Sequence, residues 1–158
     1  MPPLDTTALI RQHQGKAPVQ VGAIAHALGI NVYSGRLPVG ISGKLYRSPT
    51  EGGSSGWAIL ANNEEAKVRQ RFTIAHEIGH FVLHLDLIGD SLEDDVFYRS
   101  KLSNFREAEA NRFAADMLMP WNLIQDLSDK GHNTSAQSLA RALDVSEVAM
   151  KIRLGLPT

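Results

Sequence analysis

The sequence predicts an α+β protein: a short N-terminal sheet packed on one long helix, followed by a helical C-terminal part. Between residues 30 and 61, short apolar runs alternate with Gly- and Pro-containing turns, as strands joined by turns do. From Glu64 to His84 the apolar spacing changes from about two to about 3.6 residues, the helical period. The chain has 158 residues, so we expect a single domain over 1–158.

Composition excludes several classes of protein. Lys and Arg number 16 against 17 for Asp and Glu, so nucleic acid is not an expected partner. Cysteine is absent, which excludes disulfide scaffolds, thiol nucleophiles and Cys-ligated metals, so a metal would need His and carboxylate ligands. The sequence has neither a leader-like start nor an apolar run long enough for a membrane span, so we expect a cytoplasmic protein with no membrane partner.

The elements before the long helix follow from apolar spacing and turn residues. Helices are expected at residues 4–13 and from Val19 to Leu28, with Gly29 suited to the end of the second. The Gly- and Ser-rich stretch 49–56 is expected to be a loop. Three strands are expected, at residues 30–33, 41–47 and 56–61.

The second half of the chain is expected to be helical. The helix at 64–84 has a broad apolar surface and is therefore expected to be largely buried. A helix at 106–119 follows and stops at Pro120. Shorter helices complete residues 120–158, at Trp121–Asp129, Ser135–Leu143 and Ser146–Leu154.

The long helix carries an HExxH motif, His76-Glu77-Ile78-Gly79-His80. Residues four apart on a helix rise about 6 Å and return to nearly one face, so both imidazoles can reach one metal ion. Glu77 lies beside them and could reach a metal-bound water without being a ligand. The alternative is a helix with two stacked histidines, which would still need polar partners on so apolar a helix. Gly79, unfavourable within a helix, indicates close approach of a strand or the second helix.

A catalytic zinc ion needs a third protein ligand, which we expect from the following helix. Glu107 and Asn111 are four residues apart and share a face, so one could ligate and the other hydrogen-bond a ligand histidine. We prefer Glu107 as the ligand. Glu109 lies about 200° away around that helix and is expected to face solvent. His84 lies about 12 Å along the axis from His76, so we expect it to support a ligand or end the helix.

These residues together resemble the ImmA/IrrE family of metallo-endopeptidases. The resemblance rests on Arg71–His80 (RFTIAHEIGH) and Glu107–Pro120 (EANRFAADMLMP within it), and it extends to Ile41-Ser42-Gly43, Leu139–Ser146 and Ile152-Arg153-Leu154. It therefore covers most of the chain. The resemblance implies a small zincin-like domain, an HExxH zincin with a glutamate third ligand.

The resemblance also implies a chemistry and a substrate class. Carried over by position, His76, His80 and Glu107 would bind one Zn²⁺, or Mn²⁺, and Glu77 would be the general base. Asn111 stands where zincins of this type place an acidic or amide residue behind a ligand. Active family members cleave helix-turn-helix repressors of mobile elements or DNA-damage responses, which implies a hydrolase acting in transcription regulation.

Two features of such an enzyme are not settled by the residues. A transition-state stabiliser could come from loop residues, namely Tyr98, Arg99 or His132, although each is better explained as a surface residue. In zincins substrate lies as an extended strand along a sheet edge above the active-site helix, and the expected edge is residues 56–61. The alternative is that this strand is buried and has no free edge.

Two other functions remain open. Residues 135–154 have the look of a helix-turn-helix in which Ser146 caps a helix carrying Lys151 and Arg153, which would suit a DNA-binding regulator. The alternative for this segment is a helical hairpin that packs on the core or docks a protein substrate. The whole domain could also be a non-catalytic module that binds a repressor.

Overall fold

The computed structural model describes residues 4–88, 96–97, 102–130 and 134–158. The predicted α+β fold is confirmed, with each predicted helix and strand present and its ends shifted by a few residues. The elements, in chain order, are α1 (Leu4–Gln12), α2 (Val21–Ala27), β1 (Ile30–Gly35), β2 (Gly43–Arg47), β3 (Trp57–Asn62), α3 (Lys67–His84), the 3-10 turn η1 (Leu85–Leu87), β4 (Val96–Phe97), α4 (Asn104–Leu118), α5 (Trp121–Asp129), α6 (Ala136–Leu143) and α7 (Glu147–Leu154). Only η1 and β4 were not predicted, because elements this short show no periodicity.

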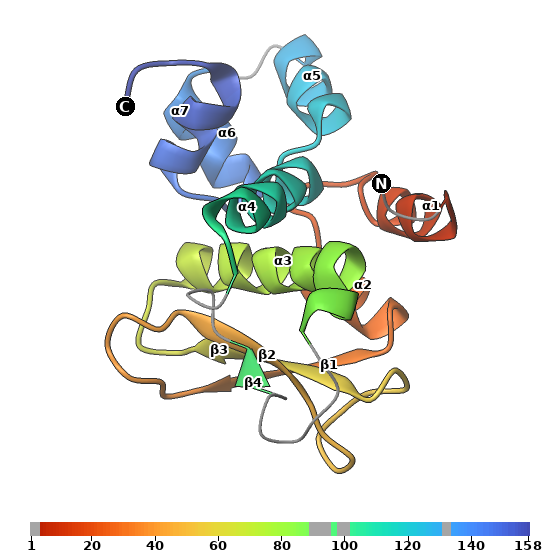
Figure 1. Ribbon diagram of the computed structural model, residues 1–158. Coiled ribbons are helices and arrows are strands. Elements are labelled where there is room, and N and C mark those ends of the chain that lie inside the picture. The colour runs from red at the N-terminus through yellow and green to blue at the C-terminus, as the bar shows by residue number, and fades with distance from the viewer. Residues whose placement is uncertain (1–3, 89–95, 98–101, 131–133) are drawn as a thin grey trace.

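The elements form successive layers (Figure 1). The sheet lies on one side of α3, and α4 crosses the opposite side of α3. The C-terminal helices α5, α6 and α7 lie beyond α4. The long helix α3 is therefore covered on both sides, which explains its broad apolar surface. No described helix has the length and apolar character needed to cross a membrane.

The sheet has the strand order β1-β3-β2-β4. Strand β3 pairs parallel with β1, with Ile30 opposite Trp57, and antiparallel with β2, with Leu45 opposite Ile59. The prediction that residues 56–61 form a sheet edge is therefore wrong, and this strand is internal. Its nearly continuous apolar run, buried on both faces, is typical of an inner strand.

Buried apolar residues fill the space between the sheet and α3, and further core residues lie on α4. Leu45 and Ile59 of the sheet and Ala75 and Ile78 of α3 are fully buried. On α4 and just beyond it, Met117, Leu118 and Met119 are at most 1% exposed, and Phe113 packs against the core while partly buried.

Gly79 allows the close approach of α4 to α3. A Cβ built at Gly79 would lie 3.3 Å from the Cα and the carbonyl oxygen of Ala110 and 3.3 Å from the Cβ of Phe113. Such contacts are tighter than side chains ordinarily make, so the two helix backbones can be this close only because position 79 has no side chain. The packing reason expected for Gly79 is confirmed, and the partner is the second helix.

Two arginines attach the α6–α7 hairpin to the rest of the protein. The Nε of Arg71 on α3 donates to the carbonyl of Asp144 at 3.0 Å, and its Nη2 donates to the carbonyl of Leu143 at 3.3 Å. The Nε of Arg153 on α7 donates to the carbonyl of Met119 at 3.0 Å, and its Nη1 to Asp116 at 2.8 Å. The hairpin is therefore fixed to both α3 and α4.

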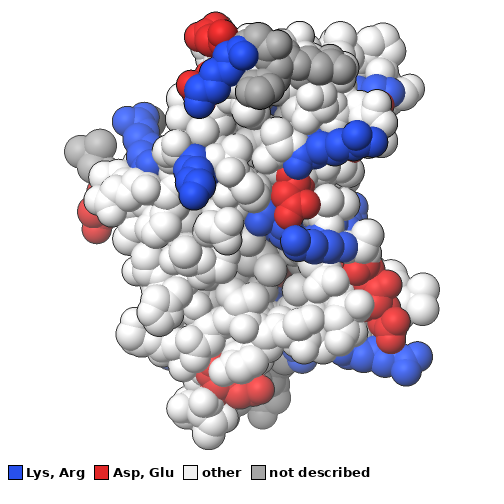
Figure 2. All heavy atoms as spheres, turned by 180° about the vertical axis from the view of Figure 1, so that it is seen from behind, with Lys and Arg blue, Asp and Glu red and all other residues white. Residues whose placement is uncertain are grey.

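This arrangement bears on the DNA-binding alternative for residues 135–154. Ser146 does cap α7 by accepting a hydrogen bond from the Ala149 amide, as the sequence predicts. The Arg153 side chain, however, is only 12% exposed and already paired, and Lys151 lies 3.6 Å from Glu147. On the face shown in Figure 2, basic and acidic side chains are interspersed and form no continuous basic surface.

Candidate metal centre

Three potential ligand atoms from two helices meet at one point. His76 and His80 lie on α3, and Glu107 lies in the first turn of α4, where the helix dipole favours a carboxylate. The Nε2 atoms of the two histidines are 3.0 Å apart, and the carboxylate oxygens of Glu107 lie 3.0 Å from His76 Nε2 and 3.2 Å from His80 Nε2. Among the described residues this is the one group of three or more potential ligands.

The separations of these atoms fit a zinc ion. Two ligands of a tetrahedral zinc ion stand about 3.3 Å apart when each bond is about 2.05 Å long. The observed 3.0 to 3.2 Å are shorter by a few tenths of an ångström, a change that small side-chain rotations supply. Two imidazole nitrogens and one carboxylate oxygen are also the donor set of many catalytic zinc sites. The residues present therefore fit the metal.

Asn111 orients the first histidine. Its Oδ1 lies 2.7 Å from His76 Nδ1, so it can accept the proton of that nitrogen. A neutral imidazole protonated on Nδ1 carries its free lone pair on Nε2, which is the atom that faces Glu107. Asn111 thereby holds His76 in the tautomer and orientation that metal binding requires.

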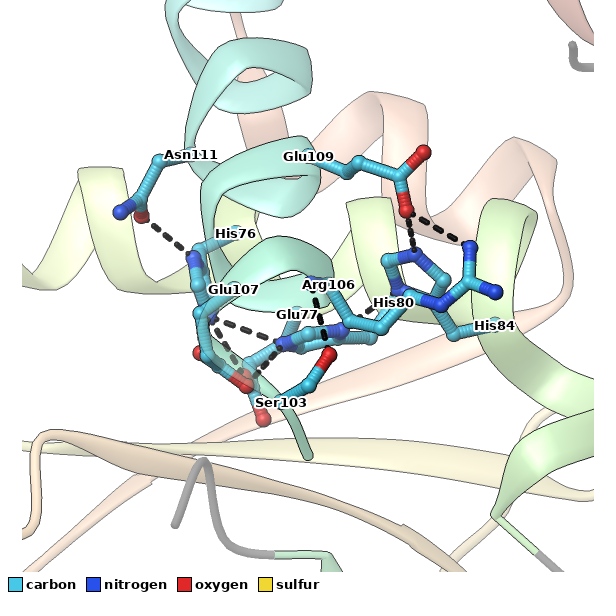
Figure 3. A network of polar contacts seen from close by, with 9 residues as sticks. All are labelled: His76, Glu77, His80, His84, Ser103, Arg106, Glu107, Glu109 and Asn111. Carbon is cyan, nitrogen blue, oxygen red and sulfur yellow. Dashed lines mark hydrogen bonds and ion pairs between the residues drawn. The ribbon is translucent and has the colours of Figure 1, made fainter. Parts of the chain in front are cut away.

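A second chain of hydrogen bonds orients the other histidine (Figure 3). His80 Nδ1 lies 2.9 Å from His84 Nδ1, and His84 Nε2 lies 2.9 Å from Glu109 Oε1. If Glu109 accepts from His84 Nε2, then His84 Nδ1 is free to accept from His80 Nδ1, which leaves the His80 Nε2 lone pair for a metal. Arg106 completes the chain by donating to the same Glu109 oxygen at 3.0 Å.

The expectation that Glu109 faces solvent is wrong. Its side chain is 29% exposed, and its carboxylate contacts His84 and Arg106. The angular position of a residue on a helix does not determine where the end of a long side chain lies, and the Glu109 carboxylate turns back toward α3. Figure 3 shows Asn111 and Glu109 reaching α3 on opposite sides of α4. Glu109 and Arg106 were therefore missed as site residues, although their i, i+3 spacing is that of an ion pair.

The surroundings of the site keep the potential ligands in the protonation states that can bind a metal. Burial, helped by the neighbouring His76 and His84, lowers the pKa of His80 to about 4, so it is neutral at neutral pH. Burial alone would raise the pKa of Glu107, but the contact with His76 and the other interactions with His76 and His80 together lower it. His80 thus presents a lone pair, and Glu107 a charged carboxylate.

Glu77 lies beside the three potential ligands. Its side chain is almost fully buried, and its Oε1 is 3.8 Å from His76 Nε2, further than the Glu107 oxygens. This position lies next to the metal-binding atoms without joining them. The possible transition-state stabilisers Tyr98, Arg99 and His132 lie outside the described residues.

The site opens into a groove between α3, α4 and α7. The groove has a volume of about 860 Å³, and His76, Glu107 and Asn111 line it. His80 and Glu77 are not among the lining residues, and both are buried behind it. Access to the potential metal position is therefore from the side of His76 and Glu107.

Comparison with known proteins assigns the family. The model of the IrrE N-terminal-like domain, Peptidase M78, matches residues 25–155. The chain belongs to this family, as the HExxH helix and the second helical motif predicted.

The relatives and structures that it matches are larger proteins. The radiation response metalloprotease IrrE of Deinococcus deserti is 41% identical over 92 residues, which are 56% of this chain and 32% of that protein. The protein of the same name from Deinococcus radiodurans is 36% identical over 93 residues, 58% of this chain and 27% of that protein. The chain thus matches about a third of the length of these curated relatives. A transcriptional regulator of Mycobacterium tuberculosis shares the fold, with a TM-score of 0.61 at 20% identity over 96% of this chain and 46% of that one.

Proposed function

We propose that this protein is a zinc-dependent endopeptidase that hydrolyses a peptide bond in a protein substrate, and that the substrate is a helix-turn-helix repressor. The observation that carries the proposal is the meeting of His76, His80 and Glu107 with Glu77 beside them. A purely structural metal site would have no need of the buried carboxylate of Glu77. The curated relatives bear the name metalloprotease, which supports the same chemistry.

In this mechanism His76, His80 and Glu107 would hold the ion, and Asn111 and His84 would keep the two imidazoles oriented. Zinc in such a site supplies Lewis acidity, which polarises a carbonyl and makes water acidic near neutral pH. The Glu77 carboxylate accepts the proton of the attacking water and then donates it to the departing amine. Because Glu77 is fully buried, its carboxylate is shielded from bulk solvent during both transfers.

The first test measures zinc content and affinity of the purified protein. Wild type should bind one equivalent of zinc, Glu107→Ala should lose it, and Glu109→Ala should retain one equivalent because its carboxylate does not face the ion. Absence of zinc binding by the folded wild type, or unchanged binding by Glu107→Ala, would contradict the proposed site.

A second test separates an enzyme from a non-catalytic binding module. Wild type and Glu77→Gln, both loaded with zinc, are incubated with a proteome-derived peptide mixture, and new peptide termini are identified by mass spectrometry. An enzyme generates new termini that disappear in Glu77→Gln, although that variant keeps its zinc. If zinc-loaded wild type produces no more termini than Glu77→Gln, the endopeptidase proposal fails and the repressor-binding module takes its place.

A further inference from the structure

The groove beside the metal centre has walls from three helices. Its lining includes His76 and Glu107 of the site and Ala149 and Ile152 of α7. Its volume of about 860 Å³ is within the range of roughly 300–1,000 Å³ that is usual for binding pockets. The C-terminal hairpin therefore forms a wall of the same cavity into which the site opens.

The walls of the groove include a set of apolar residues. Phe72 of α3 and Ala115 of α4 line it together with Met119 and Ile152. Ile152 is 67% exposed, although it is a large aliphatic residue at the mouth of a cavity. Such a residue offers apolar surface to a bound partner at no cost to the protein's own core.

The charges available in the groove are positive. Among the described residues its lining includes Arg69, Arg112 and Arg153, and the one carboxylate is that of Glu107, which the histidines engage. Arg153 is already paired with Asp116. Arg112 is exposed, and within the described part of the chain its guanidinium has no hydrogen bond or ion pair.

Arg112 is also next in sequence to a residue of the candidate metal site. It directly follows Asn111, whose side chain contacts His76. The Arg69 side chain, on α3, is 56% exposed. Its Nε comes no closer than 3.8 Å to Glu65 Oε1, which is a weak ion pair. Two cationic groups with weak or no partners among the described residues thus line the groove, one from α3 and one from α4.

The groove is built in advance of binding. Arg71 joins α3 to the α6–α7 turn, and Arg153 joins α7 to the end of α4, so the three walls are held together without a ligand. A preformed cavity loses little conformational entropy when it is filled.

We propose that this groove binds the substrate segment next to the scissile bond, and that it selects an acidic side chain with Arg112 and an apolar side chain with Ile152. The inference rests on the proposed function and adds a substrate preference to it. Charge complementarity favours an acidic peptide, because the free charge in the groove is positive. The apolar residues in the lining favour a polypeptide over a nucleic acid, because an aliphatic side chain can pack against them and a phosphate backbone cannot.

The test begins with selection of peptides from a phage-displayed random dodecapeptide library on zinc-loaded Glu77→Gln protein, which should bind without cutting. We expect Asp or Glu to be enriched together with an aliphatic residue. One selected peptide is then synthesised with its acidic residue and with the corresponding amide. Circular dichroism confirms that each variant is folded. If Glu77→Gln does not fold, Glu77→Ala is used in its place.

Matched variants in the same background assign the preference to the groove. Arg112→Gln should bind the acidic peptide about two- to fivefold more weakly, the size expected of one exposed ion pair, and its affinity for the amide peptide should be unchanged. Arg141→Gln, an exposed arginine on α6 that does not line the groove, should leave both affinities unchanged. Ile152→Ser should weaken both peptides, whereas Val148→Ser, exposed on the same helix but outside the groove lining, should not.

The outcomes separate this inference from the proposed function. Failure to select any peptide, selection without acidic residues, or an acidic preference that Arg112→Gln leaves intact would each overturn the inference. If the wild type cleaves peptides while Arg112→Gln keeps the same preference, only the inference fails. If peptides bind in an Arg112-dependent way but the wild type never cleaves them, the groove stands and the endopeptidase proposal fails.

Discussion

The two histidines of the proposed metal site have supporting partners in different surroundings, and this difference predicts unequal losses of zinc affinity. Asn111 is exposed, so if it is shortened to alanine a water molecule can replace its oxygen at His76 Nδ1. His80 and His84 are at most 1% exposed, so water cannot easily take the place of His84. We therefore compare Asn111→Ala with His84→Leu, in which the leucine fills the space that water would otherwise enter.

The expected magnitudes follow from the cost of an unsatisfied buried donor. Leaving a buried N–H without an acceptor costs about 1–3 kcal/mol, which corresponds to about 5- to 150-fold in affinity. Removing a group that supports a metal ligand typically costs about 10- to 100-fold in metal affinity. We expect about 10-fold weaker zinc binding for Asn111→Ala, where water compensates, and about 100-fold for His84→Leu, where it does not.

The assay is competition for zinc against a chelator of known affinity at neutral pH, with circular dichroism as a check of folding. Asn111→Asp and His84→Gln retain an oxygen acceptor and should recover most of the lost affinity. Wild-type affinity in both test variants, or a larger loss for Asn111→Ala than for His84→Leu, would refute this account of the two hydrogen-bond chains.

Three further predictions concern stability, and urea denaturation measures each of them. Gly79→Ala should lower the free energy of unfolding by about 1 kcal/mol. Overpacking against Ala110 costs about 1–3 kcal/mol, whereas the better helix propensity of alanine returns only about 1 kcal/mol. A more stable variant would contradict the tight contact. Arg71→Met should lower the free energy of unfolding by about 2–3 kcal/mol because it loses buried hydrogen bonds, while the exposed change Arg69→Met should alter it by no more than about 0.5 kcal/mol. Equal effects would show that Arg71 does not attach the hairpin. Burial and the nearby Glu51 raise the pKa of Tyr46 to about 12 from its usual 10, so the unfolded chain ionises first and stability falls from pH 10 to pH 12. Over that pH interval the stability of Tyr46→Phe should fall by about 1–2 kcal/mol less than that of wild type. A fall as steep as that of wild type would exclude Tyr46 as the cause.

The part of the site that could be predicted from sequence is the part fixed by helix geometry. His76 and His80 are four residues apart on one helix, and so are Glu107 and Asn111 on the next, so each pair had to share a face. Gly79 likewise indicated a close neighbour, since a glycine within a helix is otherwise unfavourable. These inferences needed only the helical period, and the structure brings all four side chains together.

The sequence alone therefore determined the α+β class, the positions of the main elements and the group of residues able to hold a metal. Tertiary structure decided that residues 57–62 form an inner strand, that Glu109 turns to His84, and that α7 supplies a wall of the groove. The physical reason is that local hydrogen bonding fixes spacing within an element. Contacts between elements depend instead on how closely whole surfaces pack, and on where long side chains end once that packing is set.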